Sequence, residues 1–253
     1  MNIFLTGATG YLGSAIAAAL VRARHDVTAL VRSTTSAARV QSYGIVAHHG
    51  DLRDASTYRD AALSADAIVH AGVESGADRI DVDRIFVDAV NGPKLIYTST
   101  LFVLGPVENG DETSPATGQR AEHEQLVLAA GGAVIRPGMI WGGEGAYLFE
   151  NPIVLDDGGN RWPLVHRDDA AELYRLVAES GARGIFHAVA EVLRARDVFP
   201  GVPATPLEEA KKKLGGFADA LALDQDVTAL RSVAIGWKPA QFFSASLSSA
   251  YGQ

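Results

Sequence analysis

The chain has 253 residues, of which 47% are hydrophobic and 21% charged, which excludes a disordered, collagen-like or disulfide-stabilised protein. Its 22 Lys and Arg residues against 30 Asp and Glu residues give a formal net charge of −8, which argues against broad binding to nucleic acid or anionic membranes. The chain contains no cysteine, so disulfides, thiolate nucleophiles and cysteine-ligated metals are excluded.

Length and hydropathy predict one domain outside the membrane. At about 150 residues per domain, the chain is one large domain or one domain with a small lobe. The longest apolar stretch near the start, Tyr11–Val21, contains Gly13 and Ser14 and follows no basic leader, whereas a spanning helix needs about 20 apolar residues. A cysteine-free chain fits a reducing compartment, so we expect a cytoplasmic protein that binds neither membrane nor nucleic acid.

Short apolar strands alternate with helices along the first half of the chain. Residues 2–6 predict a strand that ends at Gly7, residues 12–24 a helix, and residues 25–32 a second strand, which is the βαβ pattern. The same rhythm continues, with strands expected at 44–51, 66–72, 93–100 and 133–138 and helices at 54–63, 78–90 and 119–130. Alternation with near-continuous apolar strands predicts a parallel sheet covered by helices on both faces.

The regular alternation of strands and helices ends at about residue 140, and Gly and Pro are frequent around 142–145 and 158–163. Helices are expected at 168–179 and 206–214, and a short strand at 185–189. We therefore predict an α/β protein with a Rossmann-type doubly wound parallel sheet. Residues 1–253 are expected to form a single domain in which the residues from about 142 onward contribute a small C-terminal lobe.

The turn after the first strand reads GATGYLG and has glycines at positions 7, 10 and 13. Gly7 allows a sharp turn, Gly10 allows the backbone to approach a pyrophosphate, and Gly13 allows the helix to pack closely. The N–H groups and the dipole at the start of the helix would then bind the diphosphate. The alternative is an ordinary tight turn, but the position between a strand and a helix favours a dinucleotide site.

The end of the second strand favours NADP over NAD. A carboxylate there would bind the ribose of NAD, whereas an Arg would favour the 2′-phosphate of NADP. The strand ends in Val31, Arg32 and Ser33, with no carboxylate at this end. Arg32 can form charge-assisted hydrogen bonds to phosphate, and Ser33 can add a donor. We expect NADP, with NAD possible if Arg32 is only a solvated surface residue.

Several further segments occur in the order that one protein family shows. They are Gly50-Asp51-Leu52, His70-Ala71-Gly72, YTSTLFVLG (97–105), DETSP (111–115), Arg136-Pro137-Gly138, WPLVHRDDAAELY (162–174) and Ile235-Gly236-Trp237-Lys238-Pro239. Together with the GxxGxxG turn they resemble the short-chain dehydrogenase/reductase superfamily, in its extended or atypical branch of NAD-dependent epimerase/dehydratase-like proteins. The resemblance implies a small-molecule substrate, a substrate lobe after residue 142, and a monomer or homodimer.

The resemblance, together with the glycine turn and the second strand, also implies which residues contact the cofactor. They are Gly7, Thr9, Gly10, Tyr11, Leu12, Gly13, Arg32, Ser33, Asp51, Leu52, Ala71, Gly72, Thr98, Pro137 and Gly138. No metal site is expected.

The usual catalytic pair of this family is absent. Family members carry Tyr-x-x-x-Lys on the helix after the fifth strand, where the Tyr transfers a proton and the Lys lowers its pKa from about 10. One alignment of this chain places Thr117 and Ala121 at the pair, and another places Ala116 and Arg120 there. Neither supplies a phenol, and no Tyr in the chain is followed by Lys four residues later.

Thr100 stands at the position of the family's catalytic Ser or Thr. Strand alternation places Thr98 and Thr100 on the face that meets the cofactor in the family, and Tyr97 and Ser99 on the opposite face. Thr100 is therefore the candidate catalytic residue, with a hydroxyl that only satisfies the strand end as the alternative. Arg120 could add a positive charge to the site, although an Arg on such a helix is more often solvated.

Three expectations concern the remaining side chains. Asp168 is expected to cap the helix that follows it, with His166 packed beneath. Residues 122–124 are expected to be a solvated helix stretch. Three aromatic residues fall where the family builds its substrate pocket, and they either line a cleft or pack in the core: Tyr147, Phe149 and Trp162.

These observations favour an atypical NADP-dependent oxidoreductase, epimerase/dehydratase-like, that acts on a small carbonyl, hydroxyl or sugar-like compound. The short segment between Trp141-Gly142 and Trp162 favours a smaller ligand. The alternative, motivated by the missing Tyr and Lys, is a non-catalytic NADP(H)-binding sensor or scaffold protein.

Overall fold

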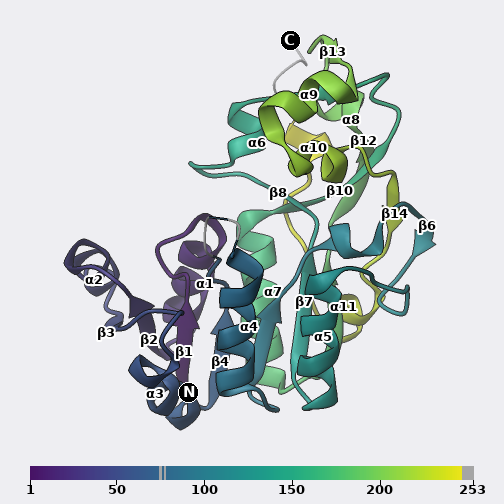
Figure 1. Ribbon diagram of the computed structural model, residues 1–253. Coiled ribbons are helices and arrows are strands. Elements are labelled where there is room, and N and C mark those ends of the chain that lie inside the picture. The colour runs from purple at the N-terminus through teal and green to yellow at the C-terminus, as the bar shows by residue number, and fades with distance from the viewer. Residues whose placement is uncertain (74–75, 77, 247–253) are drawn as a thin grey trace.

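The computed structural model describes residues 1–73, 76 and 78–246. A seven-stranded sheet forms its centre, in the order β11-β7-β5-β4-β1-β2-β3 with every neighbouring pair parallel (Figure 1). The strands are β1 (Asn2–Thr6), β2 (Asp26–Val31), β3 (Val46–His49), β4 (Ala67–His70), β5 (Leu95–Thr98), β7 (Ala133–Pro137) and β11 (Gly184–Ala188). The strand order reverses between β1 and β4, which confirms the predicted Rossmann-type sheet.

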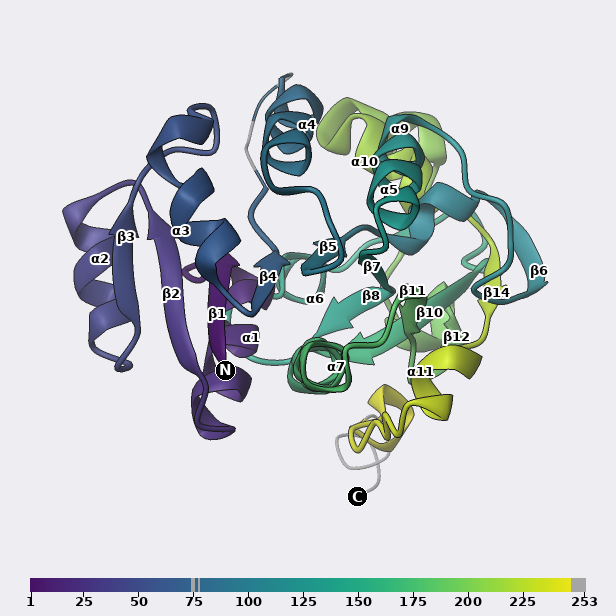
Figure 2. The same ribbon diagram turned by 90° about the horizontal axis from the view of Figure 1, so that it is seen from below.

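Helices cover both faces of this sheet, as Figure 2 shows along the strands. One face carries α1 and α7, and the other carries α3, α4 and α5. Their bounds, with that of α2 beside β3, are α1 (Tyr11–Arg22), α2 (Thr34–Gln41), α3 (Arg59–Ser64), α4 (Arg79–Val90), α5 (Gln119–Ala129) and α7 (Arg167–Ser180).

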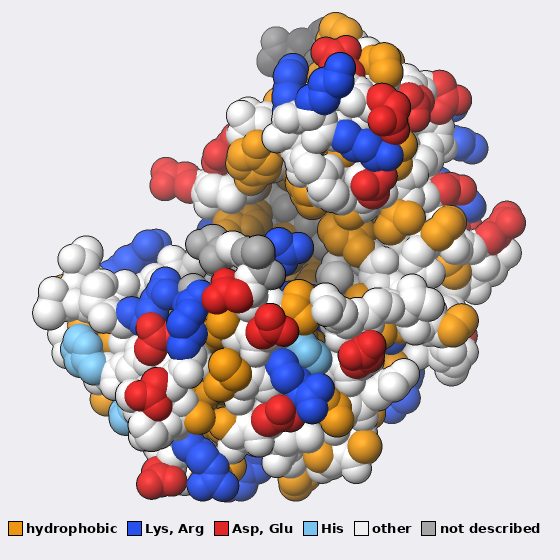
Figure 3. Space-filling model, in the orientation of Figure 1, with side chains coloured by type: hydrophobic (Ala, Val, Ile, Leu, Met, Phe, Trp, Pro, Cys, Tyr) orange, Lys and Arg blue, Asp and Glu red, His pale blue; other side chains and the backbone are white. Residues whose placement is uncertain are grey.

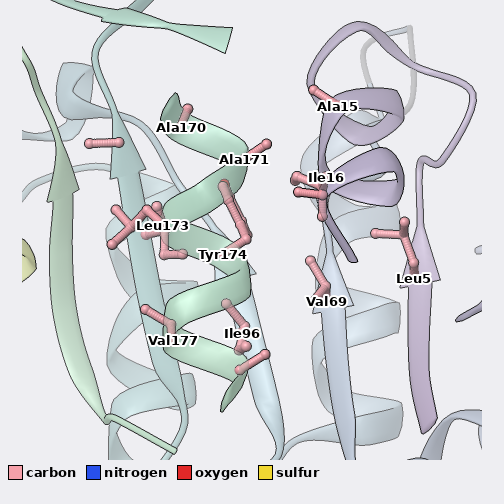
Figure 4. Packing of buried hydrophobic residues seen from close by; sticks show 14 of the residues in the cluster. Leu5, Ala15, Ile16, Val69, Ile96, Ala170, Ala171, Leu173, Tyr174 and Val177 are labelled. Atoms are coloured by element: carbon pink, nitrogen blue, oxygen red, sulfur yellow. The ribbon is translucent and has the colours of Figure 1, made fainter. Parts of the chain in front are cut away.

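The spacing of apolar residues explains how α7 packs. Ala170, Leu173, Tyr174 and Val177 recur at the i, i+3, i+4 and i+7 positions, and each is fully buried. Figure 4 shows this stripe facing β5 and the neighbouring α1, where Ile16 is buried too. Because α1 starts at the glycine turn, the packing of α7 against α1 fixes the turn relative to the later part of the chain.

A small lobe lies beyond the carboxyl ends of the central strands (Figure 1). It contains a three-stranded sheet in the order β12-β10-β8 and its own hydrophobic core. The elements outside the central layer are η2 (Leu101–Leu104), β6 (Val107–Gly110), β8 (Met139–Trp141), α6 (Tyr147–Glu150), β9 (Val154–Leu155), β10 (Arg161–His166), β12 (Glu191–Arg194), α8 (Ala195–Val198), β13 (Ala204–Thr205), α9 (Leu207–Leu214), α10 (Gly216–Leu221), β14 (Gln225–Val227) and α11 (Leu230–Ala234). After residue 142 the chain thus builds this lobe and also returns to the central layer through α7 and β11.

Two expected helices differ in detail. The helix expected at 54–63 is split into a 3-10 turn, η1 (Ala55–Thr57), and α3, with the Asp54 carboxylate capping the turn by accepting from Ser56 N at 3.0 Å. The prediction that Asp168 caps α7 is wrong. His166 occupies the N-cap with an extended backbone, and its Nδ1 accepts a hydrogen bond from Asp168 N at 3.2 Å.

The segment around Trp237 is fastened to the first turn of α7. Trp237 is buried, and its Nε1 donates to the carbonyl oxygen of Asp169 at 2.8 Å. The carboxylate of Asp169 accepts from the backbone N–H groups of Ala240 and Gln241 at 3.0 and 2.8 Å. These contacts give the Gly-Trp-Lys-Pro segment a structural role. Among the described residues, no helix combines the length and hydropathy that crossing a bilayer requires.

Candidate functional site

A cleft of about 1000 Å³ opens at the carboxyl ends of the central strands, and Figure 3 shows the hollow between the sheet and the lobe. Its walls include all but one of the residues predicted to contact a cofactor or to catalyse. They are Gly7, Thr9, Gly10, Tyr11, Leu12, Gly13, Arg32, Ser33, Leu52, Ala71, Gly72, Thr98, Thr100, Pro137 and Gly138. Asp51 is the exception, because it does not line this cleft and its carboxylate accepts from Arg53 N at 2.9 Å.

The glycine turn contains two glycines that packing requires and one that it does not. Gly7 has φ +76°, and a Cβ there would lie 2.5 Å from Ala71 O. A Cβ on Gly13 would lie 2.0 Å from Gly7 O. Gly10 has an ordinary φ of −78°, and its Cβ would approach Gly7 O at 3.2 Å. The open side of Gly10 therefore leaves room for a ligand at the start of α1.

The charge of the cleft is opposite to that of the chain. Arg32, Arg79 and Arg120 line it, and none of the described residues in its walls is acidic. The whole chain carries a formal net charge of −8. A cleft with three guanidinium groups and exposed N–H groups at a helix start is suited to an anionic ligand.

Three consecutive hydroxyl residues lie where β5 ends. Thr98 Oγ1 accepts from the hydroxyl of Tyr174 at 2.9 Å, and Thr100 Oγ1 accepts from Phe102 N at 3.3 Å. The Ser99 hydroxyl is buried and has no hydrogen-bond partner among the described residues. All three residues line the cleft. The Ser99 hydroxyl is buried, so the prediction from alternation that Ser99 lies on the face opposite to Thr98 and Thr100 stays a prediction.

Arg120 lies in the cleft at the first turn of α5. Its Nη1 donates to Thr98 O at 3.0 Å. Ala121 is buried, and neither it nor Thr117 lines the cleft. The alignment that places Ala116 and Arg120 at the family's Tyr and Lys positions is therefore the one that puts a cation in the cleft.

A buried carboxylate on α4 stands behind Arg120. Asp83 is 4% exposed, and its Oδ1 accepts from His70 Nε2 at 2.8 Å while its Oδ2 accepts from the Tyr97 hydroxyl. His123 Nδ1 lies 3.3 Å and Arg120 Nη1 3.9 Å from Oδ2. Burial opposes ionisation, but hydrogen bonds from His123 and His70 and the charge of Arg120 outweigh it and hold the pKa of Asp83 well below its ordinary range.

The same network reaches the floor of the cleft. Gly72 N donates to Thr6 Oγ1 at 2.9 Å, and Thr6 Oγ1 lies 2.7 Å from His70 Nδ1. If the Thr6 hydroxyl donates to Nδ1, then His70 carries its proton on Nε2 and donates it to Asp83. The structure thus connects Thr6 at the end of β1 and Gly72 after β4 with Arg120 through His70 and Asp83.

Residues 122–124 depart from the expectation of a solvated helix stretch, which is wrong for two of the three. His123 and Glu124 are 3% and 2% exposed. Glu124 accepts two hydrogen bonds from Arg136, from Nε at 3.0 Å and from Nη2 at 2.5 Å. The helix turns this polar face toward the sheet, where partners on β5 and β7 satisfy it.

The aromatic residues expected in the substrate region do not line the cleft. Trp162 is buried in the core of the lobe, where its Nε1 donates to Leu221 O at 2.8 Å. Tyr147 is exposed, and Phe149 packs against the lobe core. The phenylalanines in the cleft walls are instead Phe102 and Phe217.

Comparison with known proteins agrees with this architecture. Residues 3–122 match the model of the NAD dependent epimerase/dehydratase family. The Uncharacterized protein C2A9.02 of Schizosaccharomyces pombe is 30% identical over 94% of this chain and 95% of its own length. A 2-alkyl-3-oxoalkanoate reductase of Stenotrophomonas maltophilia is 30% identical over 73% of this chain and 67% of its own length.

Among solved structures, the human epimerase family protein SDR39U1 with NADPH superimposes with a TM-score of 0.77, at 17% identity and covering 98% of both chains. This likeness shows a shared fold. The sequence and the fold together establish that the chain belongs to the NAD-dependent epimerase/dehydratase family, as its motifs predicted.

Proposed function

We propose that the protein is an NADP-dependent oxidoreductase that acts on a small carbonyl or hydroxyl compound. One observation carries the proposal. A single cleft runs from the glycine turn and Arg32 to Thr100 and Arg120, so an extended anionic cofactor at one end would reach polar side chains at the other. The NADPH of the human neighbour and the name of the Stenotrophomonas relative support a nicotinamide dinucleotide and a carbonyl substrate.

The cofactor end suits a dinucleotide with a 2′-phosphate. Gly10 leaves the start of α1 open to a diphosphate. Its φ of −78° is one that any residue can adopt, so backbone conformation does not explain why a glycine stands here. Arg32 and Ser33 line the cleft at the end of β2, and Ser33 Oγ also caps α2 by accepting from Ser36 N at 3.1 Å. A guanidinium at the end of β2, where NAD-binding members of this fold carry a carboxylate, supports the phosphate of NADP over the ribose diol of NAD.

The catalytic end would bind and polarise the substrate oxygen. The bound nicotinamide supplies hydride transfer, whereas Thr100 would orient the oxygen and Arg120 would stabilise negative charge on it. Burial raises the pKa of the Tyr174 hydroxyl, which therefore stays protonated and serves as a donor to Thr98. With no phenol at the family position, water is the proton source we propose.

The test separates binding from chemistry. The purified protein is titrated with NADPH and NADH by calorimetry and then incubated with NADPH and a panel of aldehydes, ketones and nucleotide sugars. We expect tighter binding of NADPH and carbonyl-dependent loss of its absorbance. Tight NADPH binding with no turnover of any compound would leave the sensor or scaffold alternative, and absence of binding would eliminate both.

We further propose a cytoplasmic location, since a cysteine-free chain fits a reducing compartment. Size-exclusion chromatography with light scattering distinguishes a monomer from a homodimer.

A further inference from the structure

The wall of the cleft that faces the lobe is apolar. Three separate segments contribute to this wall, through Phe102 on η2, Ile140 on β8 and Phe217 on α10. The rings of Phe102 and Phe217 meet edge to face with centroids 6.3 Å apart. Phe217 is 38% exposed. Figure 3 shows hydrophobic side chains gathered around the hollow, so this wall offers apolar surface that a ligand can cover.

Polar groups at this end are few and are close together. Ser99, Thr100 and Arg120 are grouped where β5 and α5 meet, and the Ser99 hydroxyl is buried with no partner among the described residues. Among the described residues that line the cleft there is no Asp, Glu, Asn, Gln or His. A sugar ring presents several hydroxyl donors, and each one buried without an acceptor costs about 1–3 kcal/mol.

Arg120 retains donors for a ligand. In the described part of the chain it donates one hydrogen bond, from Nη1 to Thr98 O at 3.0 Å, and its side chain lines the cleft and is 20% exposed. A guanidinium has five N–H donors. Together with the hydroxyl of Thr100, these donors can bind one carbonyl oxygen, but they cannot satisfy a polyol that extends along the apolar wall.

From this separation of polar and apolar surface, we infer that the substrate is an apolar ketone or aldehyde rather than a nucleotide sugar. Its carbonyl oxygen faces Arg120 and the hydroxyl of Thr100, and its alkyl or aryl part covers Phe102 and Phe217. This inference rests on the proposed oxidoreductase function. In the reducing direction the carbonyl carbon gains a hydride and the oxygen gains a proton from water, so the ketone becomes an alcohol while NADPH is oxidised to NADP⁺.

The test uses methyl ketones from 2-butanone to 2-decanone, compared with keto-sugar nucleotides, in the NADPH-coupled assay. We expect kcat/KM to rise two- to fourfold for each added methylene until the apolar wall is covered, since burial of one CH₂ contributes ~0.8 kcal/mol. Phe217→Ser should flatten this dependence on chain length without changing the Kd for NADPH. Phe242 is 41% exposed and does not line the cleft, so Phe242→Ser is the matched control and should preserve the slope.

A second measurement does not depend on turnover. The thermal midpoint of the protein with saturating NADP⁺ is recorded with 1-octanol and with UDP, and we expect an increase with the alcohol only, which Phe217→Ser abolishes. A preference for keto-sugar nucleotides, or stabilisation by UDP alone, would overturn the substrate class and leave the oxidoreductase proposal standing. If the protein binds NADPH but reduces no carbonyl and is not stabilised by the alcohol, both the oxidoreductase proposal and the substrate class are refuted.

Discussion

The carboxylate of Asp83 on α4 lies 3.9 Å from the guanidinium of Arg120 on α5, and both face the end of β5. The carboxylate is buried and the guanidinium lines the cleft. Asp83 is therefore a positioning residue: through Arg120 it influences the cleft without lining it. Its hydrogen bonds to His70, Tyr97 and His123 leave the carboxylate one orientation, which in turn restricts where the Arg120 head group rests.

The first prediction concerns Asp83→Asn. The change removes the charge that the hydrogen bonds of a buried carboxylate depend on, while Arg120 is 20% exposed and partly screened, so at pH 7 the free energy of unfolding should fall by about 1.5–3 kcal/mol. Because the folded-state pKa of Asp83 is lowered from its ordinary value, about 3.9 in peptides, the ionised carboxylate stabilises the fold above pH ~4, and this stabilisation is lost as the pH falls toward the folded-state pKa.

Urea unfolding at pH 7, 5, 4 and 3 measures this dependence. The difference between the wild type and Asp83→Asn should shrink below pH ~4, and a difference that stays constant would contradict the argument. Asp88 on the same helix forms an exposed ion pair with Arg84 at 2.8 Å. Asp88→Asn should therefore change stability by less than about 0.5 kcal/mol.

The second prediction tests cofactor preference through Arg32→Ala. Loss of one charge-assisted phosphate contact should weaken NADPH binding by about 1.5–3 kcal/mol, roughly 10-fold to 150-fold, and leave NADH nearly unaffected. Calorimetry with both cofactors measures the change. Arg39 is exposed on α2 and does not line the cleft, so Arg39→Ala should change neither affinity. Equal losses for NADPH and NADH in Arg32→Ala would refute the assignment.

The third prediction separates two glycines of the turn. Gly10→Ala should retain its fold, with a thermal midpoint within a few degrees of wild type, but should lose at least about tenfold in NADPH affinity, because the methyl group occupies the space for the diphosphate. Gly13→Ala should lose at least about 3 kcal/mol of stability, because its Cβ would lie 2.0 Å from the backbone oxygen of Gly7 and the chain would have to move. Thermal unfolding and NADPH titration of both variants check this. Unimpaired NADPH binding by Gly10→Ala would exclude a diphosphate at this turn.

The fourth prediction concerns Thr100→Val. Loss of the hydroxyl should lower kcat by about 10- to 100-fold, because oriented donors to the reacting oxygen act in the transition state. The Kd for NADPH should remain within about twofold of the wild-type value, since Thr100 is not part of the glycine turn or of the end of β2, where the cofactor phosphates are proposed to bind. Thr113 is exposed and outside the cleft, so Thr113→Val serves as the control. A wild-type kcat for Thr100→Val would contradict a catalytic role of the hydroxyl and would show that it only caps η2.

Local patterns explain why much of the fold follows from the sequence. The first strand, the glycine turn and α1 are encoded by neighbouring residues, since an apolar run, positive φ at Gly7 and the spacing in α1 are local properties. Asp83 was missed, although a signal existed. It lies on the apolar stripe of α4 beside Val82, Phe86 and Val87. Burying a carboxylate there without a partner would cost folding free energy, so the position itself indicates a buried partner.

Contacts between distant segments explain the rest. Phe217 reaches the cleft from α10, more than 100 residues beyond Phe102, and the short run Gly216–Leu221 does not indicate which lobe side chain faces inward. From the sequence, Glu124 is typical of an exposed helix residue. Only the folded structure shows that Arg136 on β7 lies beside it and donates two hydrogen bonds to it. Register within one element is a local property, but partners across elements depend on how the sheet assembles.

The described residues that line the cleft include three arginines and no carboxylate, and this affects how fast a ligand binds to a chain with a formal net charge of −8. An approaching polyanion meets repulsion from the net negative exterior over roughly one Debye length, about 8 Å at physiological salt, whereas the exposed Arg32 and Arg79 and the partly buried Arg120 attract it only at the cleft. Salt weakens the outer repulsion more than contacts made inside, where water is displaced. Moderate ionic strength should therefore speed the arrival of a phosphate-bearing ligand, the reverse of what a basic, steering surface produces.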